Sequence, residues 1–328
     1  MKNYDFIAIG DIVTDAFIKI KEATIEDGTD GGTKICMRFG DKIPYEDVFI
    51  IPAVGNSANA SVSAARLGLK SALVTNLGED YYGKECLDVL KKEKVGTEFV
   101  KIHKNKKTNY HYVLLFKEER TILIKHEDFK YSLPKIGNPK WIYLSSLGPN
   151  SLAFHAEIEK YLAKHLEVNL AFQPGTYQIK FGASALAGIY KRANIFTCNR
   201  EEAQRILGVK EDDIKKLLQG IHSLGPKIVA ITDGKKGAYL YSENKMWFMP
   251  PYPDPKPPIN RTGAGDAFSS TLTVAILLGK SIEEALKWGP INSMAVTQQM
   301  GARAGLLSRK KLEELLSKAP ADYKPKLI

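Results

Sequence analysis

The feature that most constrains the fold of this 328-residue chain is a repeated order of short apolar runs and longer helical patterns. The apolar runs are rich in β-branched and aromatic residues, as strands are, and they lie at 6–9, 71–76, 141–145, 168–172, 195–197 and 227–232. Segments with helical periodicity separate them, at 58–67, 83–93, 151–166, 201–207 and 212–224. This order predicts an α/β fold whose mostly parallel sheet is covered by helices on both faces. Ligands then bind at the carboxyl ends of the strands.

Two segments break this order. Residues 16–52 contain the segments 17–21 and 33–38, which could form strands, without a helical pattern, and residues 109–126 read as a hairpin that turns at 117–120. We expect a small β-sheet outside the main sheet, with an edge extension of the main sheet as the alternative. Six prolines within residues 250–258 predict an extended connector.

The connector leads to residues 260–266, Asn-Arg-Thr-Gly-Ala-Gly-Asp, which precede an apolar run at 267–278. A helix that begins here would direct unpaired backbone N–H groups and its positive dipole end at one spot, which suits an anion. Gly263 and Gly265 allow the backbone to approach a ligand closely, and Asp266 would lie beside it. A carboxylate there can remove a proton from a nucleophile, whereas the alternative is a simple N-cap.

This heptad resembles the D-T-x-G-A-G-D motif of the ribokinase (PfkB) family of carbohydrate and nucleoside kinases. Other segments are similar to family motifs and stand in the family order, at 6–11 with Asp15, 55–60 with 64–68, 199–202 and 232–237. The resemblance spans about residues 5–308. It implies one ribokinase-like three-layer α/β/α domain over 1–328, with a mostly parallel central sheet. It further implies that segments 16–52 and 108–127 form a lid over the sugar site, which often builds a homodimer interface in the family.

The resemblance implies ATP-dependent phosphoryl transfer to a hydroxyl of a small sugar. Asp266 would be the general base, and the backbone N–H groups of Gly263, Ala264 and Gly265 would form the anion hole. For the acceptor it implies Asp15, with Asp11, Gly55, Asn56 and Asn59 nearby. Such carboxylate and amide groups suit a polyol, although Asn59 could instead cap the helix that follows it.

On the nucleotide side, Asn199 and Glu202 resemble the pair that holds the hydration shell of Mg²⁺ without binding the metal directly. An N-cap with its capping-box partner is the alternative for this pair. The remaining residues implied to contact the nucleotide are Thr232, Gly234, Arg261 and Asn292.

The chain departs from the family pattern at two places. Asn260 and Arg261 replace the usual Asp-Thr, whose aspartate helps to form a monovalent-cation site in several members, so activation by potassium is not expected. Arg261 would instead reach the nucleotide phosphates. Val54 replaces the first of two glycines, which would narrow the acceptor pocket or shift its loop.

Two other functions remain open. The first is a nucleoside kinase of the same family, in which Tyr110, Tyr112 and Phe116 could stack on a base. The second is a non-catalytic sugar or nucleotide sensor, against which Asp266 argues because a pure binder needs no base. A dehydrogenase or a P-loop kinase is disfavoured, because neither G-x-G-x-x-G after the first strand nor G-x-x-x-x-G-K-[ST] occurs.

The formal charge of +10 comes from lysines interspersed with acids, as at 91–94 and 210–216, which favours a solvated surface over a nucleic-acid partner. There is no run of 18 apolar residues and no basic, apolar leader, so we expect no membrane association and a cytoplasmic location. The three cysteines lack the spacing of a disulfide framework or a zinc site.

Overall fold

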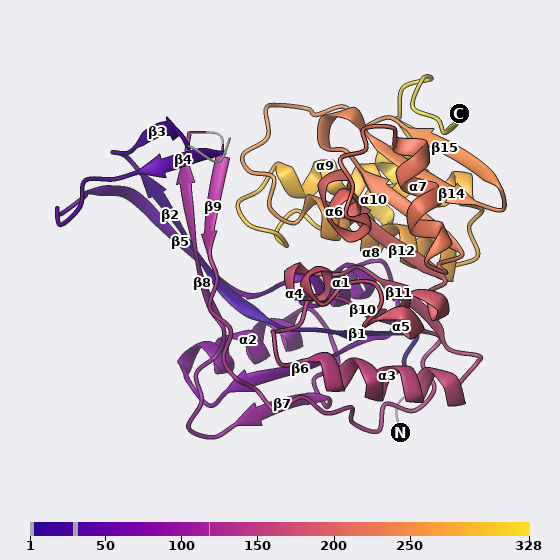
Figure 1. The fold of residues 1–328 in the computed structure, drawn as a ribbon, viewed down its shortest axis with the longest axis horizontal. Coiled ribbons are helices and arrows are strands. Elements are labelled where there is room, and N and C mark those ends of the chain that lie inside the picture. Colours follow the sequence, from indigo (N-terminus) through magenta and orange to yellow (C-terminus); the bar gives the residue numbers. More distant parts are fainter. Residues whose placement is uncertain (1–2, 29–31, 118) are drawn as a thin grey trace.

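The computed structural model describes residues 3–28, 32–117 and 119–328. A large sheet with helices on both faces forms the main body, and a smaller sheet projects from it (Figure 1). In spatial order the large sheet contains β16 (Lys326–Leu327), β15 (Lys245–Met249), β14 (Ala238–Ser242), β13 (Ile228–Thr232), β12 (Ile195–Asn199), β11 (Asn169–Phe172), β10 (Trp141–Leu144), β1 (Phe6–Ile9), β6 (Ser71–Gly78) and β7 (Val100–His103). The strands from β13 to β7 are parallel, and β14 to β16 continue the sheet in antiparallel fashion.

The order of the strands reverses beside β1. From β1 the chain continues to β6 and β7 on one side, and then returns to build β10, β11, β12 and β13 in turn on the other side. Such a switch point leaves a crevice at the carboxyl ends of the two diverging strands, because their connections lead in opposite directions. The crevice therefore lies beyond Ile9 and Leu144, the last residues of β1 and β10.

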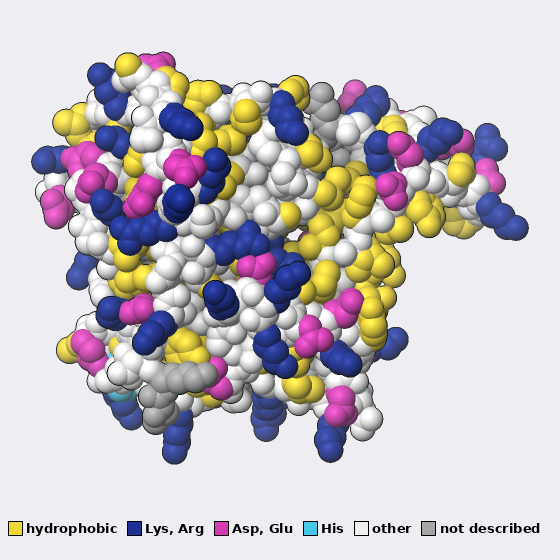
Figure 2. Space-filling view, turned by 180° about the vertical axis from the view of Figure 1, so that it is seen from behind, with side chains coloured by type: hydrophobic (Ala, Val, Ile, Leu, Met, Phe, Trp, Pro, Cys, Tyr) yellow, Lys and Arg dark blue, Asp and Glu magenta, His cyan; other side chains and the backbone are white. Residues whose placement is uncertain are grey.

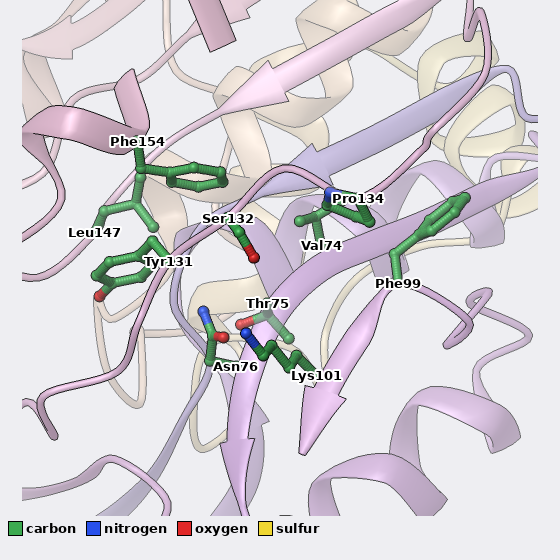
Figure 3. A pocket seen from close by; sticks show the side chains of 10 residues that line it. All are labelled: Val74, Thr75, Asn76, Phe99, Lys101, Tyr131, Ser132, Pro134, Leu147 and Phe154. Atoms are coloured by element: carbon green, nitrogen blue, oxygen red, sulfur yellow. The ribbon is translucent and has the colours of Figure 1, made fainter. Parts of the chain in front are cut away.

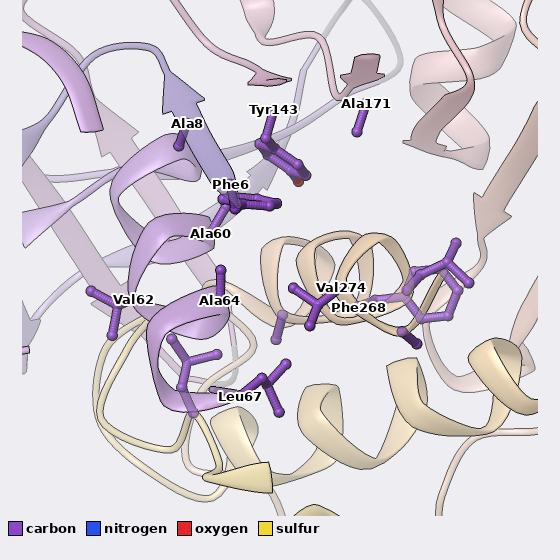
Figure 4. Close-up of a cluster of buried hydrophobic side chains, with 14 of the residues drawn as sticks. Phe6, Ala8, Ala60, Val62, Ala64, Leu67, Tyr143, Ala171, Phe268 and Val274 are labelled. Atoms are coloured by element: carbon purple, nitrogen blue, oxygen red, sulfur yellow. The ribbon is translucent and has the colours of Figure 1, made fainter. Parts of the chain in front are cut away.

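Alternate residues of β1 enter two different hydrophobic layers. Phe6 and Ala8 pack in the layer under α1 (Asn56–Arg66) and α8 (Ala264–Leu277), and Figure 4 shows members of this cluster from both helices, such as Ala64 and Val274. Other helices that contribute to this layer are α2 (Tyr81–Lys92), α9 (Ile282–Thr297) and α10 (Arg309–Ser317). Ile7 and Ile9 point the other way, since side chains alternate along a strand. Burial on both faces explains the continuous apolar runs and confirms the three-layer fold.

The opposite layer is formed by helices from the middle of the chain. They are α3 (Leu152–Lys164), α4 (Thr176–Phe181), α5 (Ala187–Arg192), α6 (Arg200–Leu207) and α7 (Ile214–Ser223). The expected bounds of these strands and helices agree with the observed ones to within two residues, and β6 and α2 are examples of the full two-residue difference. Strand β12 extends two residues beyond the expected end at residue 197, because Asn199 still pairs with Thr232 of β13.

The smaller sheet, which we call the lid, has the strand order β5 (Tyr45–Val54), β2 (Val13–Ile20), β8 (Tyr110–Phe116) and β9 (Glu119–Leu123). It is separate from the main sheet, so the edge-extension alternative is wrong. The short hairpin β3 (Thr24–Asp27) and β4 (Thr33–Cys36) lies at its far end (Figure 1). The strand expected up to 126 ends at Leu123, and part of the expected turn, residue 118, lies outside the described residues.

The proline-rich segment 250–258 contains no helix or strand, as expected of a connector. Within the described ranges, the helices are all too short or too polar to cross a membrane. Figure 2 shows Lys and Arg side chains interspersed with acidic ones on the face that it presents.

Candidate functional site

A cavity of about 390 Å³ lies at the carboxyl ends of the parallel strands, between the main body and the lid. The strand ends contribute Asp11 after β1, Gln173 after β11, Asn199 at the end of β12 and Thr232 at the end of β13. The site residues predicted from the sequence line this cavity, with the exceptions of Ala264, Gly234 and Asn292. Segments that are more than 200 residues apart in the sequence thus meet in one cavity, as between Asn59 and Asp266.

Asp266 is held in place by two side-chain amides. Its Oδ2 accepts a hydrogen bond from Asn59 Nδ2 at 2.8 Å, and its Oδ1 accepts one from Gln173 Nε2 at 3.0 Å. Burial raises the pKa of this carboxyl group, while the two amides and the charge of Arg120 act in the opposite direction. A carboxylate with a raised pKa and a fixed orientation is well suited to accept a proton from a bound hydroxyl.

The N-terminus of α8 requires a glycine. Gly263 is the N-cap with a φ of 81°, and a Cβ at this position would lie 2.6 Å from Ala302 Cα. Helix α8 starts at Ala264, so Asp266 lies inside the first turn and the alternative role as N-cap is wrong. The Ala264 N–H has a long contact of 3.4 Å with the Arg261 carbonyl oxygen. Gly263 and Gly265 line the cavity, and this places the positive end of the helix dipole there.

Two further carboxylates lie at the lid end of the cavity. Asp11 accepts hydrogen bonds from the Tyr131 hydroxyl at 2.9 and 3.0 Å, and His126 Nδ1 is 3.1 Å from its Oδ2. Asp15 lies on lid strand β2, directly opposite His111 of β8, with 3.5 Å between Asp15 Oδ1 and His111 Nδ1. That separation is too long for a good hydrogen bond, and Asp15 Oδ1 is buried without a partner among the described residues.

Two groups at the lid end of the cavity have strongly shifted pKa values. Burial, with a contribution from the charge of Asp266, raises the pKa of Asp15 to about 7. Burial, together with the charge of His126, lowers the pKa of His111 to about 4. Around neutral pH the pair is therefore mostly a neutral histidine beside a carboxyl group near its midpoint. Such a carboxyl group can either donate or accept a hydrogen bond from a ligand hydroxyl.

The start of α1 brings the chain close to Asp11. Gly55 has a φ of 109°, and a Cβ there would lie 2.8 Å from the Asp11 carbonyl oxygen, so only glycine fits. Asn56 begins α1 and lines the cavity. Asn59 lies one turn later, where it binds Asp266, so it does not cap the helix.

Where β12 meets α6, Asn199 and Glu202 form a reciprocal capping box. Asn199 Oδ1 accepts from the Glu202 N–H at 2.8 Å, and Glu202 Oε2 accepts from the Asn199 N–H at 2.9 Å. The capping alternative is therefore correct, and both side chains also line the cavity. Burial raises the pKa of Glu202, and the charges of Asp266 and Glu201 raise it slightly further. The hydrogen bond from the Asn199 N–H and the charge of Arg205 act in the opposite direction.

The other predicted nucleotide contacts differ in position. Thr232 and Arg261 line the cavity, and Gly234 is exposed at the start of the η1 turn (Gly234–Lys236) that follows β13. Asn292 is fully buried, with its Nδ2 donating to Thr271 Oγ1 at 2.7 Å and its Oδ1 accepting from the Leu307 N–H at 2.9 Å. Both ends of its amide thus hold protein segments together, and we assign no ligand contact to it.

The two departures from the family pattern have local explanations. Asn260 Oδ1 accepts from the Thr262 N–H at 2.8 Å, which fixes the turn before α8. Val54 is buried at the end of β5 and pairs with Val13, so its side chain does not narrow the cavity. Tyr110 and Tyr112 lie on the strand face opposite to His111 and do not line the cavity, and Tyr110 packs against Tyr82 with ring centroids 4.7 Å apart.

Five residues of the site were not predicted from the sequence: Gln173, His111, His126, Arg120 and Tyr131. Gln173 had a usable signal, because it is a polar residue directly after a buried strand. The lid residues 120, 122, 124 and 126 alternate along one chain segment and share one face toward the cavity. That periodicity was visible in the sequence, although the direction of the face was not.

A second, much smaller cavity of about 60 Å³ lies near β6 and β7 (Figure 3). Its walls include Thr75, Lys101, Phe154 and the ring of Tyr131, whose hydroxyl group binds Asp11 of the main site. It is too small for a sugar or a nucleotide, so the larger cavity is the candidate active site. Among the described residues, no group of three or more His, Cys, Asp or Glu side chains could hold a metal ion.

Comparisons with known proteins agree with this arrangement. The model of the pfkB family carbohydrate kinases matches residues 52–309. Ribokinase of Bacillus subtilis is 27% identical over 271 residues, which cover 80% of this chain and 87% of that protein. A nucleoside kinase of Methanothermobacter thermautotrophicus is 22% identical over 259 residues, which cover 77% of this chain and 80% of the relative. The solved structure of Arabidopsis thaliana ribokinase complexed with ribose and ATP has a TM-score of 0.79 at 22% identity, covering 96% of this chain and 99% of the other.

Proposed function

Because the chain belongs to the pfkB family of carbohydrate kinases and has a ribokinase-like fold, we propose that it transfers the γ-phosphoryl group of ATP to a primary hydroxyl of a small sugar. The observation that carries this proposal is the position of Asp266. This carboxylate is oriented by Asn59 and Gln173, and it lies at a glycine-rich helix N-terminus within one cavity that has both acceptor-type and phosphate-type groups.

In the proposed reaction, the hydroxyl groups of the sugar bind Asp11 and Asp15 at the lid end of the cavity. Asp266 accepts the proton of the attacking hydroxyl while its oxygen forms a bond to the γ-phosphorus and the bond from that phosphorus to the β-phosphate oxygen breaks. The N–H groups of Gly263, Ala264 and Gly265 stabilise the charge on the phosphoryl oxygens, and Arg261 binds the nucleotide phosphates. Gly263, Gly265 and Arg261 line the cavity, and Ala264 lies between the two glycines.

Magnesium fits the residues at the end of β12. Asn199 and Glu202 present amide and carboxylate groups to the cavity. Their capping box uses one lone pair of Asn199 Oδ1 and one of the two carboxylate oxygens of Glu202, so both side chains keep acceptor capacity for metal-bound water. We propose that they bind water molecules of a hydrated Mg²⁺ that arrives with ATP, in keeping with the preference of this ion for retained waters. Bound in this way, the ion would neutralise charge on the β- and γ-phosphates. A monovalent cation is not part of the proposal, since Asn260 fixes the turn in which the family aspartate would stand.

A nucleoside is the second candidate acceptor. Tyr177 at the start of α4 lines the cavity, and its ring lies 5.3 Å from that of His126, so a base could pack against it. We rank a sugar first because Asp11 and Asp15, together with their histidine partners, fit a small acceptor that has several hydroxyl groups. A non-catalytic sensor is disfavoured by the two amides that orient Asp266.

The test is ATP consumption with Mg²⁺ over a panel of pentoses, hexoses, sugar phosphates and nucleosides, for the native chain and for Asp266→Asn. We expect turnover on a free sugar and a loss of roughly 10²- to 10⁴-fold in the variant, with ATP binding retained. Turnover on nucleosides alone would replace the substrate class and keep the mechanism. Binding without turnover on every acceptor would favour the sensor.

We also propose that the lid pairs with a second copy of the chain. Several large hydrophobic side chains of the lid are exposed, and Figure 2 shows hydrophobic side chains gathered where the lid joins the main body. Val48 and Ile50 on edge strand β5 are 40% and 50% exposed. Light scattering should give a dimer for the native chain and a monomer for Ile50→Glu. The control Leu166→Glu changes an exposed residue outside the lid and should leave the dimer intact.

A further inference from the structure

Arg120 is placed on the lid so that it can reach the reaction centre. It lies on β9, an edge strand of the lid, and shares its strand face with Ile122. Ile122, together with Ile124 and His126 just after the strand, also lines the cavity. Through the register of the lid, Arg120 pairs with Leu115, which in turn pairs with Lys19, four residues beyond Asp15 along β2. Four residues of strand correspond to about 13 Å, so only a long side chain can reach into the cavity from there.

The guanidinium group of Arg120 has no ion-pair or hydrogen-bond partner among the described residues. By contrast, Arg38, another arginine near the lid, contacts Asp41 at 3.4 Å. Arg120 and Arg261 are the cationic side chains among the described residues that line the cavity, whose carboxylates are Asp11, Asp15, Glu202 and Asp266. The charge of Arg120 acts on Asp266. An unpaired arginine in a cavity of this kind is available for an anionic ligand.

Two anions could meet this guanidinium group: a charged substituent of the acceptor, or the phosphoryl group in transfer. The lid end of the cavity, where the acceptor binds in the proposed function, contains the carboxyl groups of Asp11 and Asp15. These would repel a charged substituent once ionised. The phosphoryl group instead reaches the hydroxyl that Asp266 activates. Arg120 lines the same cavity as Asp266, and its charge makes a small contribution that lowers the pKa of this carboxyl group.

We propose that Arg120 is a catalytic residue that the lid brings to the phosphoryl group during its transfer. This inference rests on the proposed function. While the acceptor oxygen bonds to the γ-phosphorus and the bond to the ADP oxygen breaks, negative charge spreads over the equatorial phosphoryl oxygens. Arg120 keeps its proton and donates N–H groups to these oxygens, while Asp266 receives the proton of the hydroxyl. Because its planar fork matches two oxygens at once, lysine is a poor substitute.

A consequence is that lid and main body each supply one arginine. Arg261 belongs to the loop before α8 and stays with the main body, whereas Arg120 moves with any displacement of the lid. Transfer would then depend on the lid lying over a bound acceptor, since one of the two arginines would otherwise be absent from the phosphoryl group. Water alone would be a poor acceptor for the same reason.

The experiment compares Arg120→Gln, Arg120→Lys and Arg120→Ala with the matched control Arg38→Gln. For each protein, kcat and KM are measured for ATP and for the acceptor that the native chain phosphorylates. We expect Arg120→Gln to lower kcat by roughly 10²- to 10³-fold with KM values within about threefold, and Arg120→Lys to regain little. Guanidinium ion added to Arg120→Ala should restore part of kcat, which a purely structural loss would not permit. Arg38→Gln should match the native chain.

Binding of a transition-state mimic provides an independent measurement. ADP with aluminium fluoride and the acceptor should bind Arg120→Gln at least about tenfold more weakly than the native chain, whereas ADP alone should bind equally. An unchanged kcat in Arg120→Gln would overturn the inference and leave the proposed function intact. A raised acceptor KM with unchanged kcat would also overturn it, because Arg120 would then bind the acceptor. A native chain that is inactive on the whole panel would overturn the proposed function and this inference with it.

Discussion

Removal of the Asn59 side chain should shift the pH dependence of the reaction in a direction that the structure defines. Asn59 donates to Asp266 Oδ2 at 2.8 Å, and this hydrogen bond stabilises the charged carboxylate against the effect of burial. Asp266 must be ionised to accept a proton, so activity falls as the pH drops through its pKa. In Asn59→Ala the carboxylate loses one donor, and its pKa should rise further.

The size of the shift follows from the strength of the bond. A hydrogen bond to a charged group contributes about 1.5 to 3 kcal/mol, and one pKa unit corresponds to about 1.36 kcal/mol. The acidic limb of kcat/KM should therefore move upward by about 1 to 2 pH units. Above the new pKa, activity should recover to within a few-fold of the native value, because Gln173 still orients Asp266 at 3.0 Å.

The fold should tolerate this change. Asn59 Oδ1 is buried without a partner among the described residues, so its removal eliminates an unsatisfied acceptor, and alanine is a good helix former within α1. Ser61→Ala is the matched control, since Ser61 lies on the same helix and its hydroxyl donates to the Ala58 carbonyl oxygen at 2.8 Å. The assay is a pH profile of kcat/KM from about pH 4 to pH 9, with thermal denaturation alongside.

The result that would refute this reasoning is a limb that stays in place or moves downward in Asn59→Ala. An equal loss of activity at every pH would also contradict it, because Asn59 would then act on the substrate and not through the pKa of Asp266. The same shift in Ser61→Ala would show that α1 as a whole, and not the amide, sets the protonation of the base.

Three further predictions follow from the site. Gly263→Ala should lower the free energy of unfolding by more than about 2 kcal/mol and abolish turnover, because the φ of Gly263 is 81° and an added Cβ would clash with Ala302. Gly265→Ala is the control, and it should keep the native melting temperature because the space around the added Cβ is open. The stabilising contribution of protonated Asp15 is fully present below about pH 4 and is lost as the pH rises through about 7. The melting temperature of Asp15→Asn, relative to that of the native chain, should therefore increase from pH 4 to pH 8. A difference in melting temperature that stays constant with pH would contradict this. Glu202→Gln should retain the capping box and the stability of α6 but require about tenfold more Mg²⁺ for half-maximal activity, and an unchanged requirement in a magnesium titration would remove Glu202 from the proposed site.

The local pattern of the chain was enough to predict the layers of the fold. Buried strands such as β1 and β10 are short apolar runs with helical segments between them, and this order leaves few arrangements other than a parallel sheet covered on both faces. The separate lid was also predicted, because residues 16–52 and 109–126 have strand character without helices. The turn before Asp266 was identifiable because glycine at positive φ and a helix start have local sequence signals.

What the sequence by itself determined was therefore the element types, the lid and the residues that can carry chemistry. The tertiary structure decided which of these residues meet. Asn59 and Gln173 are 207 and 93 residues from Asp266, and no local pattern specifies that their amides converge on its carboxylate. The tertiary structure also decided that Asn292 is buried within the fold, away from the cavity, whereas Arg120 lines the cavity. The physical reason is that periodicity defines which side chains share a face, whereas the partner of that face depends on long-range packing of the whole chain.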